Sequence, residues 1–353
     1  MKALVLHAVD DARCEFVCAP EPKQGQVRIR VGYCGVCNSD LLRFFGKGPY
    51  AFPLICGHEF AGVVDKLGPG VEIFAPGDRV TVFPLLWCGQ CGPCEERLYA
   101  KCLNYNYLGS RTDGAFAEFV IAPVQNLLRL PDGISLEEAA LCEPAAVALH
   151  ALRGTGGCSL GDVVAVFGAG PIGLLVAQWG RAMGASIVIV VDVISEKLAI
   201  ADELGFKYLV DGRKQDPVEA VNKLTGGLGA DVCVDAAGVP VTTRQSLQGA
   251  SRGGRAVLLG NPSADVLLPV SLISQTLRRE VCIHGTWNSE YSVFAHDDDW
   301  HRSIAGMLSG TIRVKPLISH KLSLDRAFEA LRRMRESREW YCKVLINPGA
   351  GGE

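Results

Sequence analysis

The 353-residue sequence has no excess of basic charge and no long uninterrupted apolar run. Thirty-five lysines and arginines stand against 38 acidic residues, and the net charge of −3 gives no positive field for nucleic acid or an anionic membrane. The first residues, MKALVLHAVDDARC, lack the apolar core of a secretion signal, and glycines and a proline interrupt the apolar segment 163–176. We therefore expect a cytoplasmic protein with no nucleic-acid or membrane partner.

The 14 cysteines do not indicate a disulfide framework. In a long intracellular chain, clustered cysteines more often bind metal, whereas isolated ones behave as small apolar side chains. The segment CGQCGPCEERLYAKC has C-x2-C-x2-C-x7-C spacing, formed by Cys88, Cys91, Cys94 and Cys102. Four thiolates in one glycine-containing loop predict a closed structural zinc site, with an iron–sulfur cluster as the competing interpretation.

Two sequence patterns divide the chain. Residues 1–146 contain short β-rich runs, such as QVRIRVGYCG and DRVTVF, bounded by glycine and proline turns. Residues 147–286 alternate apolar strands with helical segments, which is typical of a doubly wound parallel sheet. Residues 287–353 return to a mixed pattern. The sequence thus predicts an α/β fold with one β-rich domain (1–146 and 287–353, including a lobe at 88–102) and one Rossmann domain (147–286).

A glycine motif predicts the nucleotide site. VAVFGAGPIG has G-x-G-x-x-G spacing between a strand and a helix, and its candidate cofactor contacts are Gly168, Gly170, Pro171, Ile172 and Gly173. The glycines permit a tight turn, close approach of a pyrophosphate and close helix packing, while the helix N-terminus favours negative charge.

Asp192 ends the next predicted strand and strengthens this interpretation. Its carboxylate can accept hydrogen bonds from ribose hydroxyls and would repel a 2′-phosphate, which favours NAD over NADP. Lys197 is a further candidate for ribose contact. The alternative is that the glycines and Asp192 only shape the turn.

A second set of ligand types is dispersed along the chain. GYCGVCNSD contains Cys37, PLICGHEFAG contains His58 and Glu59, and CEPAA contains Glu143. A catalytic zinc needs about three protein ligands and one open position, and this set can supply them. None of the four residues is convincing alone, so the prediction depends on their combination.

Two neighbours of Cys37 extend the hypothesis. Asp40 could orient His58 as a hydrogen-bonded carboxylate. Ser39 could hydrogen-bond an alcohol on the zinc and carry its proton outward.

The chain resembles the medium-chain, zinc-dependent alcohol dehydrogenase family from end to end. The motifs that carry this resemblance are GHEFAG, the four-cysteine lobe, GDRV at 77–80 and GAGPIG. The resemblance implies a GroES-like catalytic domain around an inserted Rossmann domain, two zinc ions per chain, and assembly as homodimers or homotetramers. It also implies that Cys37 and His58 bind the catalytic zinc. Glu143 takes the place of a second cysteine, as in the sorbitol and threonine dehydrogenase branch. Glu59 and Glu143 both stay open as the direct ligand, and Cys142 is a further alternative.

Three local strings, FPLLWCGQC, NYNYLGSRTDGAFAEF and GTWNSEYS, resemble a subgroup that acts on sugar-alcohol phosphates, the galactitol-1-phosphate 5-dehydrogenases. This resemblance implies hydride transfer between a secondary alcohol of a polyol phosphate and NAD, with zinc as the Lewis acid. Candidates for the phosphate are Arg43, Lys47 and Arg111, because guanidinium groups suit phosphate oxygens. Tyr50 and Asn288 are candidates for substrate hydroxyls. Each is equally well explained as an ordinary surface or loop residue.

Other interpretations stay open at this point. The substrate could be an unphosphorylated polyol or a diol, within the same enzyme class. A non-catalytic zinc- or nucleotide-binding protein is a remote alternative. The complete set of ligand types, together with the glycine motif, disfavours it. Leu42 occupies the position of a relay histidine found in many alcohol dehydrogenases, so a proton leaving Ser39 must pass through water or another group. Residues 254–286 are expected to form a sheet edge suited to pairing between subunits.

Overall fold

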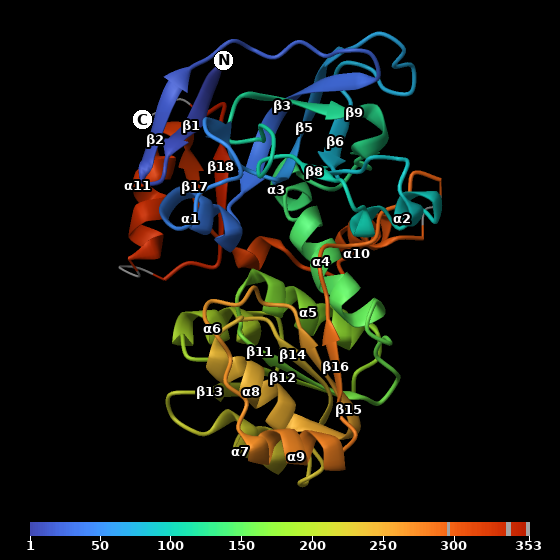
Figure 1. Ribbon diagram of the computed structural model, residues 1–353, viewed down its shortest axis with the longest axis vertical. Helices are drawn as coiled ribbons and strands as arrows, with labels where there is room; N and C mark the ends of the chain where they lie inside the picture. The colour runs from blue at the N-terminus through green and yellow to red at the C-terminus, as the bar shows by residue number, and fades with distance from the viewer. Residues whose placement is uncertain (295–296, 337–339, 351–353) are drawn as a thin grey trace. The chain divides into compact units, whose positions relative to one another are not determined.

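The computed structural model describes residues 1–294, 297–336 and 340–350, which form two compact units. Unit 1 comprises Met1–Glu143, Glu290–Leu308 and Ile318–Glu353. Unit 2 comprises Pro144–Ser289 and Ser309–Leu317. Figure 1 shows a β-rich unit 1 and, in unit 2, a parallel sheet with helices packed against it. The predicted α/β class is confirmed.

Unit 1 contains sheets of seven, three and two strands. The seven-stranded sheet has the order β10-β6-β5-β3-β18-β17, with β9 also paired to β3, beside the sheets β2-β1-β4 and β7-β8. The strands of these three sheets are β1 (Lys2–Ala8), β2 (Asp11–Phe16), β3 (Gln26–Gly35), β4 (Leu54–Ile55), β5 (Glu59–Leu67), β6 (Arg79–Val82), β7 (Leu85–Leu86), β8 (Asn106–Tyr107), β9 (Phe119–Pro123), β10 (Leu127–Arg129), β17 (Ile318–Ser323) and β18 (Lys343–Asn347).

The long strand β3 organises this unit, because β5, β9 and β18 all pair with it. Val27, Ile29 and Val31 alternate along β3 and are buried, as expected for a strand with one face on a core. The helices of unit 1 are α1 (Asn38–Phe45), α2 (Gly92–Glu95), α3 (Leu136–Ala139), α10 (Asp299–Leu308) and α11 (Leu324–Arg335), and α4 (Cys142–Arg153) crosses from unit 1 into unit 2.

Unit 2 is a doubly wound domain. Its parallel sheet has the order β13-β12-β11-β14-β15-β16, the strand order of a dinucleotide-binding fold. The strands are β11 (Val163–Phe167), β12 (Ile187–Asp192), β13 (Tyr208–Asp211), β14 (Ala230–Asp235), β15 (Ala250–Leu258) and β16 (Cys282–Gly285). The helices are α5 (Pro171–Ala182), α6 (Ser195–Glu203), α7 (Pro217–Leu224), α8 (Pro240–Gly249) and α9 (Val270–Arg278). Consecutive residues of β11 and β14 are buried, so helices cover both faces of the sheet centre.

The segment Ser309–Leu317, expected with the β-rich domain, lies in unit 2 instead. Gln178 on α5 provides the physical reason. Its buried side-chain Oε1 accepts the Arg313 backbone N–H at 2.7 Å, and its Nε2 donates to the Arg313 carbonyl at 3.2 Å. A buried amide satisfied at both ends by one residue's backbone fixes that segment on α5. In the part of the chain that the structure describes, no helix has the length and apolar character needed to cross a membrane.

Three glycines allow backbone segments to meet immediately before His58. Gly57 has φ +95°, and a Cβ atom at either Gly109 or Gly114 would lie 2.2 Å from its carbonyl oxygen. The Ala115 backbone N–H also donates to that oxygen at 2.9 Å. Glycine is therefore required at these positions for segment 109–115 to support the chain beside His58.

Replacing Gly109 by alanine should lower the free energy of unfolding by more than about 3 kcal/mol, because the added Cβ collides with backbone and φ is positive. Gly77→Ala is the matched control, since Gly77 also has positive φ but no atom within 4 Å of an added Cβ. Its loss should be about 1–2 kcal/mol. Urea unfolding measures both, and equal losses would contradict the close-approach argument.

Candidate active site and metal centres

The glycine motif joins β11 to α5 in unit 2. Gly168 has φ +111°, and a Cβ at Gly173 would lie 1.8 Å from the Gly168 carbonyl oxygen, so both glycines are required by the turn itself. Gly170 caps α5, and Pro171 and Ile172 form the first turn of the helix. A Cβ at Gly170 would meet no protein atom within 4 Å. The helix N-terminus is thus left clear on that side, as an anionic nucleotide requires.

Asp192, at the end of β12, fixes this turn. Its Oδ2 accepts the Ala169 backbone N–H at 2.6 Å, and its Oδ1 accepts the N–H groups of Val193 and Ile194 at 2.7 and 2.8 Å. A carboxylate has about four acceptor positions, so a place for a ribose hydroxyl remains. Lys197 lies in the first turn of α6 and is half-buried.

Asp235, which ends β14, has a supporting role that the sequence analysis did not identify. It is buried and accepts hydrogen bonds from the backbone N–H groups of Ala237 and Gly238 and from the hydroxyls of Thr242 and Thr243. A Cβ at Gly168 would touch Ala237 at 3.0 Å, so Asp235 shapes the loop packed against the glycine turn. Its position after an apolar strand, like that of Asp192, was the available signal.

The four-cysteine lobe in unit 1 brings all four Sγ atoms within 4.8 Å of one another. Sγ of Cys91 lies 3.5 Å from Sγ of Cys94 and 3.9 Å from Sγ of Cys102. Zinc–sulfur bonds of about 2.3 Å in a tetrahedron place sulfurs about 3.8 Å apart, so the lobe fits a zinc ion. Backbone hydrogen bonding from Leu103 helps to lower the pKa of Cys91 to about 6, which favours the thiolate.

A second metal set lies elsewhere in unit 1. Cys37 precedes α1, His58 precedes β5 and Glu59 begins it, and one possible ligand atom from each lies within 4.8 Å of the others. One thiol, one imidazole and one carboxylate at this separation suit a zinc ion with a position left for substrate. The structure thus brings together three residues that the sequence separates by up to 22 positions.

Asp40 connects these ligands to the rest of unit 1. It is buried, its Oδ2 accepts the Cys37 backbone N–H at 2.9 Å, and its Oδ1 lies 3.6 Å from Nδ1 of His58. Burial raises the pKa of Asp40, but His58 and then Arg43 outweigh burial and hold that pKa below its usual value. Asp40 is therefore a carboxylate that faces the imidazole, as a positioning group for a metal-bound histidine would be.

Arg43 connects α1 to the loop after β8. Its guanidinium donates to Asp40 Oδ1, Ser39 Oγ and Ser110 Oγ, each at 3.0 Å. These contacts use both terminal nitrogens of a side chain predicted to bind substrate phosphate. Ser39 is half-buried and accepts one of these hydrogen bonds.

Lys343 on β18 is a buried cation that the sequence analysis missed. Its Nζ donates to Glu59 Oε2 at 2.6 Å and to the Val36 carbonyl at 3.1 Å. A single lysine in an apolar C-terminal strand carries no spacing signal, and its partner lies 284 positions away. Only the fold brings them together.

Glu143, in the first turn of α4, has a different partner. Tyr107 donates its hydroxyl to Glu143 Oε1 at 3.3 Å, and the Tyr107 ring meets His58 edge-on at 5.7 Å between centroids. Burial, together with Glu59, raises the pKa of Glu143 to about 7 despite the opposing effect of His58. Cys142 turns away, since its thiol donates to the Trp300 carbonyl and burial raises its pKa well above the usual value.

The substrate candidates fall into separate places. Arg111 lies between the rings of Tyr50 and Tyr105, with its guanidinium carbon 4.4 and 4.0 Å from their centroids. Lys47 is exposed beyond α1. Asn288 belongs to unit 2, where it is buried with φ +60°, and its Nδ2 has no hydrogen-bond partner among the residues that the structure describes.

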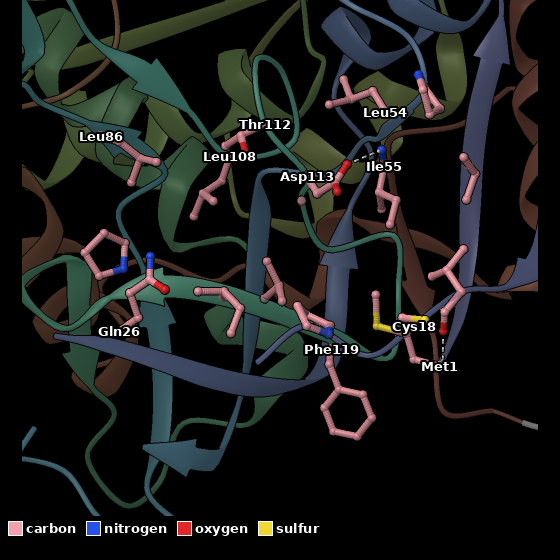
Figure 2. Close-up of a pocket in the computed structure, with 18 residues that line it drawn as sticks. Met1, Cys18, Gln26, Leu54, Ile55, Leu86, Leu108, Thr112, Asp113 and Phe119 are labelled. Carbon is pink, nitrogen blue, oxygen red and sulfur yellow. Dashed lines mark hydrogen bonds between the residues drawn. The ribbon is translucent and has the colours of Figure 1, made fainter. Parts of the chain in front are cut away.

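A cavity of about 530 Å³ opens in unit 1 between the N-terminal strands and β9. Figure 2 shows Asp113 among the lining residues, hydrogen-bonded to the Ile55 backbone N–H and accompanied by apolar side chains such as Leu54 and Leu108. Among the described residues that line it there is no predicted metal ligand, nucleotide contact or substrate contact.

Comparison with known proteins agrees with this geometry. A family model described as alcohol dehydrogenase GroES-like domain matches residues 23–132, and one described as zinc-binding dehydrogenase matches residues 171–305. Galactitol 1-phosphate 5-dehydrogenase of Escherichia coli K12 is 33% identical over 333 residues, covering 94% of this chain and 96% of that protein. Sorbitol dehydrogenase of Bacillus subtilis 168 is 31% identical over 354 residues, covering 99% and 97%.

Solved structures give the same result. The crystal structure of galactitol-1-phosphate dehydrogenase from Escherichia coli superposes with a TM-score of 0.92 at 32% identity, covering 99% of this chain and 100% of that one. A zinc-binding dehydrogenase of Sinorhizobium meliloti 1021 bound to NADP superposes with a TM-score of 0.90 at 32% identity, covering 98% and 99%. The chain belongs to the zinc-dependent medium-chain alcohol dehydrogenase family, with a GroES-like and a Rossmann-type domain.

Proposed function

We propose that this protein oxidises a secondary alcohol of a polyol phosphate, such as galactitol 1-phosphate, with NAD as the hydride acceptor. The class, a zinc-dependent alcohol or polyol dehydrogenase, follows from the family. That the substrate carries a phosphate group is a more specific proposal, and one observation supports it.

That observation is the setting of Arg111. Its guanidinium is stacked between two tyrosine rings and donates to the Tyr105 carbonyl at 2.9 Å and to the Tyr50 hydroxyl at 3.3 Å. Stacking fixes a planar fork without neutralising its charge, which preorganises it for a dianion. The neighbouring Ser110 is tied to Arg43, which holds this loop to the helix that follows Cys37. Arg111 is thus the favoured phosphate contact, with Tyr50 beside it, while Arg43 has a supporting role.

The catalytic zinc would be held by Cys37, His58 and a carboxylate, for which Glu59 fits the compact set and Glu143 lies nearby. A second zinc would be held by the four-cysteine lobe. Zinc at the first site supplies Lewis-acid chemistry to the alcohol oxygen. The Ser39 hydroxyl is proposed to accept the alcohol proton and pass it to water. Arg43, which donates to Ser39 Oγ, cannot take that proton because its guanidinium is already fully protonated.

NAD is the proposed cofactor, although one similar structure contains NADP. Proposed contacts are the turn at Gly168–Gly173 and the carboxylate of Asp192, with Lys197 at the ribose. Asp192 supports NAD, because its charge is placed at the end of β12 beside the glycine turn and would repel a 2′-phosphate.

A homodimer or homotetramer is proposed because β16 is the exposed edge of its sheet. Ile283 on this strand and Leu277 and Val270 on the preceding helix are exposed apolar side chains. The cytoplasm is the proposed compartment, since it would keep the four lobe cysteines reduced and able to bind zinc.

An unphosphorylated polyol or diol is the second candidate, supported by the similarity to sorbitol dehydrogenase.

For galactitol 1-phosphate, kcat/KM should exceed the values for galactitol, sorbitol and 2,3-butanediol by about a hundredfold, because charge-assisted contacts to phosphate contribute about 1.5–3 kcal/mol. NADH absorbance measures the rates. Arg111→Met should lower kcat/KM for the phosphate substrate at least about tenfold and leave neutral substrates unchanged. Arg97→Met, which removes an exposed arginine stacked on Phe294, is the control. Equal rates with neutral polyols would overturn the phosphate proposal but not the dehydrogenase class.

Asp192→Asn should reverse much of the preference for NAD. The amide oxygen can still accept from the backbone N–H groups of Val193 and Ile194, while the hydrogen bond from Ala169 and the charge that repels a 2′-phosphate are removed. The ratio of NADPH to NADH affinity should rise about tenfold or more, measured by nucleotide fluorescence titration. Asp216→Asn, at the exposed cap of α7, should leave the ratio unchanged. An unchanged ratio in the Asp192 variant would remove its proposed role.

Zinc binding to the catalytic site should weaken as the pH falls below about 7, the pKa of Glu143 in the metal-free protein. Between pH 8 and pH 6 this carboxyl alone should reduce the affinity about tenfold, because zinc must displace its proton. This pKa lies above the usual 4.5, so the same group lowers metal-free stability as the pH rises from 4.5 to about 7. Chelator competition in Glu143→Gln should show a shallower pH dependence, while Glu137→Gln, at a partly exposed carboxylate, should match the native protein.

A further inference from the structure

Lys343 is a buried charge at the edge of the candidate catalytic metal set. The residue is 3% exposed, and its acidic partner at hydrogen-bond distance, Glu59, is 1% exposed. Lysine is almost never fully buried unless it is paired, since an unpaired charge in the interior is strongly unfavourable. The ion pair therefore holds both side chains in place.

Strand register creates the room for this pair. Gly35 on β3 pairs with Glu59 of β5 on one side and with Leu345 of β18 on the other. A Cβ at Gly35 would lie 2.2 Å from Oε2 of Glu59, the oxygen that accepts from Lys343. A side chain on the central strand would thus separate the lysine from the carboxylate.

The charges around the set explain what the lysine does. With zinc present, the thiolate of Cys37 and the carboxylates of Glu59 and Glu143 carry three negative charges against two positive ones, and Lys343 supplies the third. Asp40 is already balanced by Arg43 at 3.0 Å. Without zinc, Lys343 is a cation in direct contact with the carboxylate of Glu59. Its charge compensates the ligands when the metal is absent and repels the metal when it is present.

We propose that Lys343 is the positioning residue of the catalytic metal site, an internal counter-ion that keeps Glu59 beside Cys37 and His58 without zinc and limits how tightly zinc is held. This inference rests on the proposed catalytic zinc site. The two candidate carboxylate ligands differ in this respect, because Glu59 is paired with a cation, whereas Glu143 accepts a hydrogen bond from the neutral phenol of Tyr107.

Lys343→Met, which keeps an unbranched chain without charge, tests the proposal in the full-length protein. Competition with a chromogenic chelator should show at least tenfold tighter zinc binding at the weaker of the two sites. The thermal midpoint of the metal-free protein should fall by about 10 °C, because the carboxylate loses its buried partner. Lys321→Met, on the neighbouring strand β17, is the matched control, since Lys321 forms an exposed ion pair with Glu137 of α3. The zinc affinity and the metal-free thermal midpoint of the Lys321→Met variant should match those of the native protein.

Tighter zinc binding together with a lower metal-free thermal midpoint identifies Lys343 as a counter-ion, since the loss of a merely structural lysine would weaken zinc binding and lower stability together. Unchanged values, or a joint decrease, overturn the proposal. The double variant Glu59→Gln with Lys343→Met replaces the pair by neutral side chains and covers the case in which the single variant does not fold. Its metal-free midpoint should recover to within about 3 °C of the native value. A midpoint that stays as low as in Lys343→Met, or failure of the double variant to fold, contradicts the pair. If the native chain binds only one zinc, the proposed catalytic site itself fails.

Discussion

The need to neutralise buried charge governs the arrangement of unit 1 around its candidate metal ligands. Asp40 faces His58 and Arg43, Glu59 faces Lys343, and Glu143 accepts from Tyr107. Arg43 lies on the same helix as Asp40, but His58, Lys343 and Tyr107 each come from another segment than the carboxylate they face, so satisfying these groups also fixes how the segments pack. A zinc ion adds two charges to a set that the protein has already balanced in part, and the ligands can therefore occupy their positions before the metal arrives.

The two units solve different chemical problems with different local devices. In unit 2, glycines remove side chains from a turn so that an anionic group can approach a helix N-terminus, and Asp192 and Asp235 hold the flanking loops by accepting backbone hydrogen bonds. In unit 1, glycines let backbone segments and a buried ion pair approach one another. The same residue type thus serves ligand access in one unit and ligand positioning in the other.

The nucleotide turn and the four-cysteine lobe could be predicted from the sequence because each is local, with all its essential residues within a short span. The parallel sheet was predictable for the same reason, since strands such as IVIVVD carry their own apolar signal. Cys37, His58 and Glu143 could be predicted only as a combination of dispersed ligand types, which the family resemblance then supported, because their contacts depend on tertiary structure. Lys343 and Tyr107 gave no signal, as their roles exist only through partners that other strands supply. The placement of 309–317 in unit 2 depended on a single buried amide, Gln178, which no pattern reveals.

The separation between Glu59 and Lys343 also bears on the order in which the molecule can be completed. The whole of β11–β16 lies between them in the sequence, so a growing chain presents Cys37, His58 and Glu59 long before β18 is synthesised. Until then β3 lacks one of its neighbours and Glu59 lacks its cation. The β-rich unit is thus a discontinuous folding unit, and its candidate metal site can reach its final electrostatic state only after unit 2 has been made.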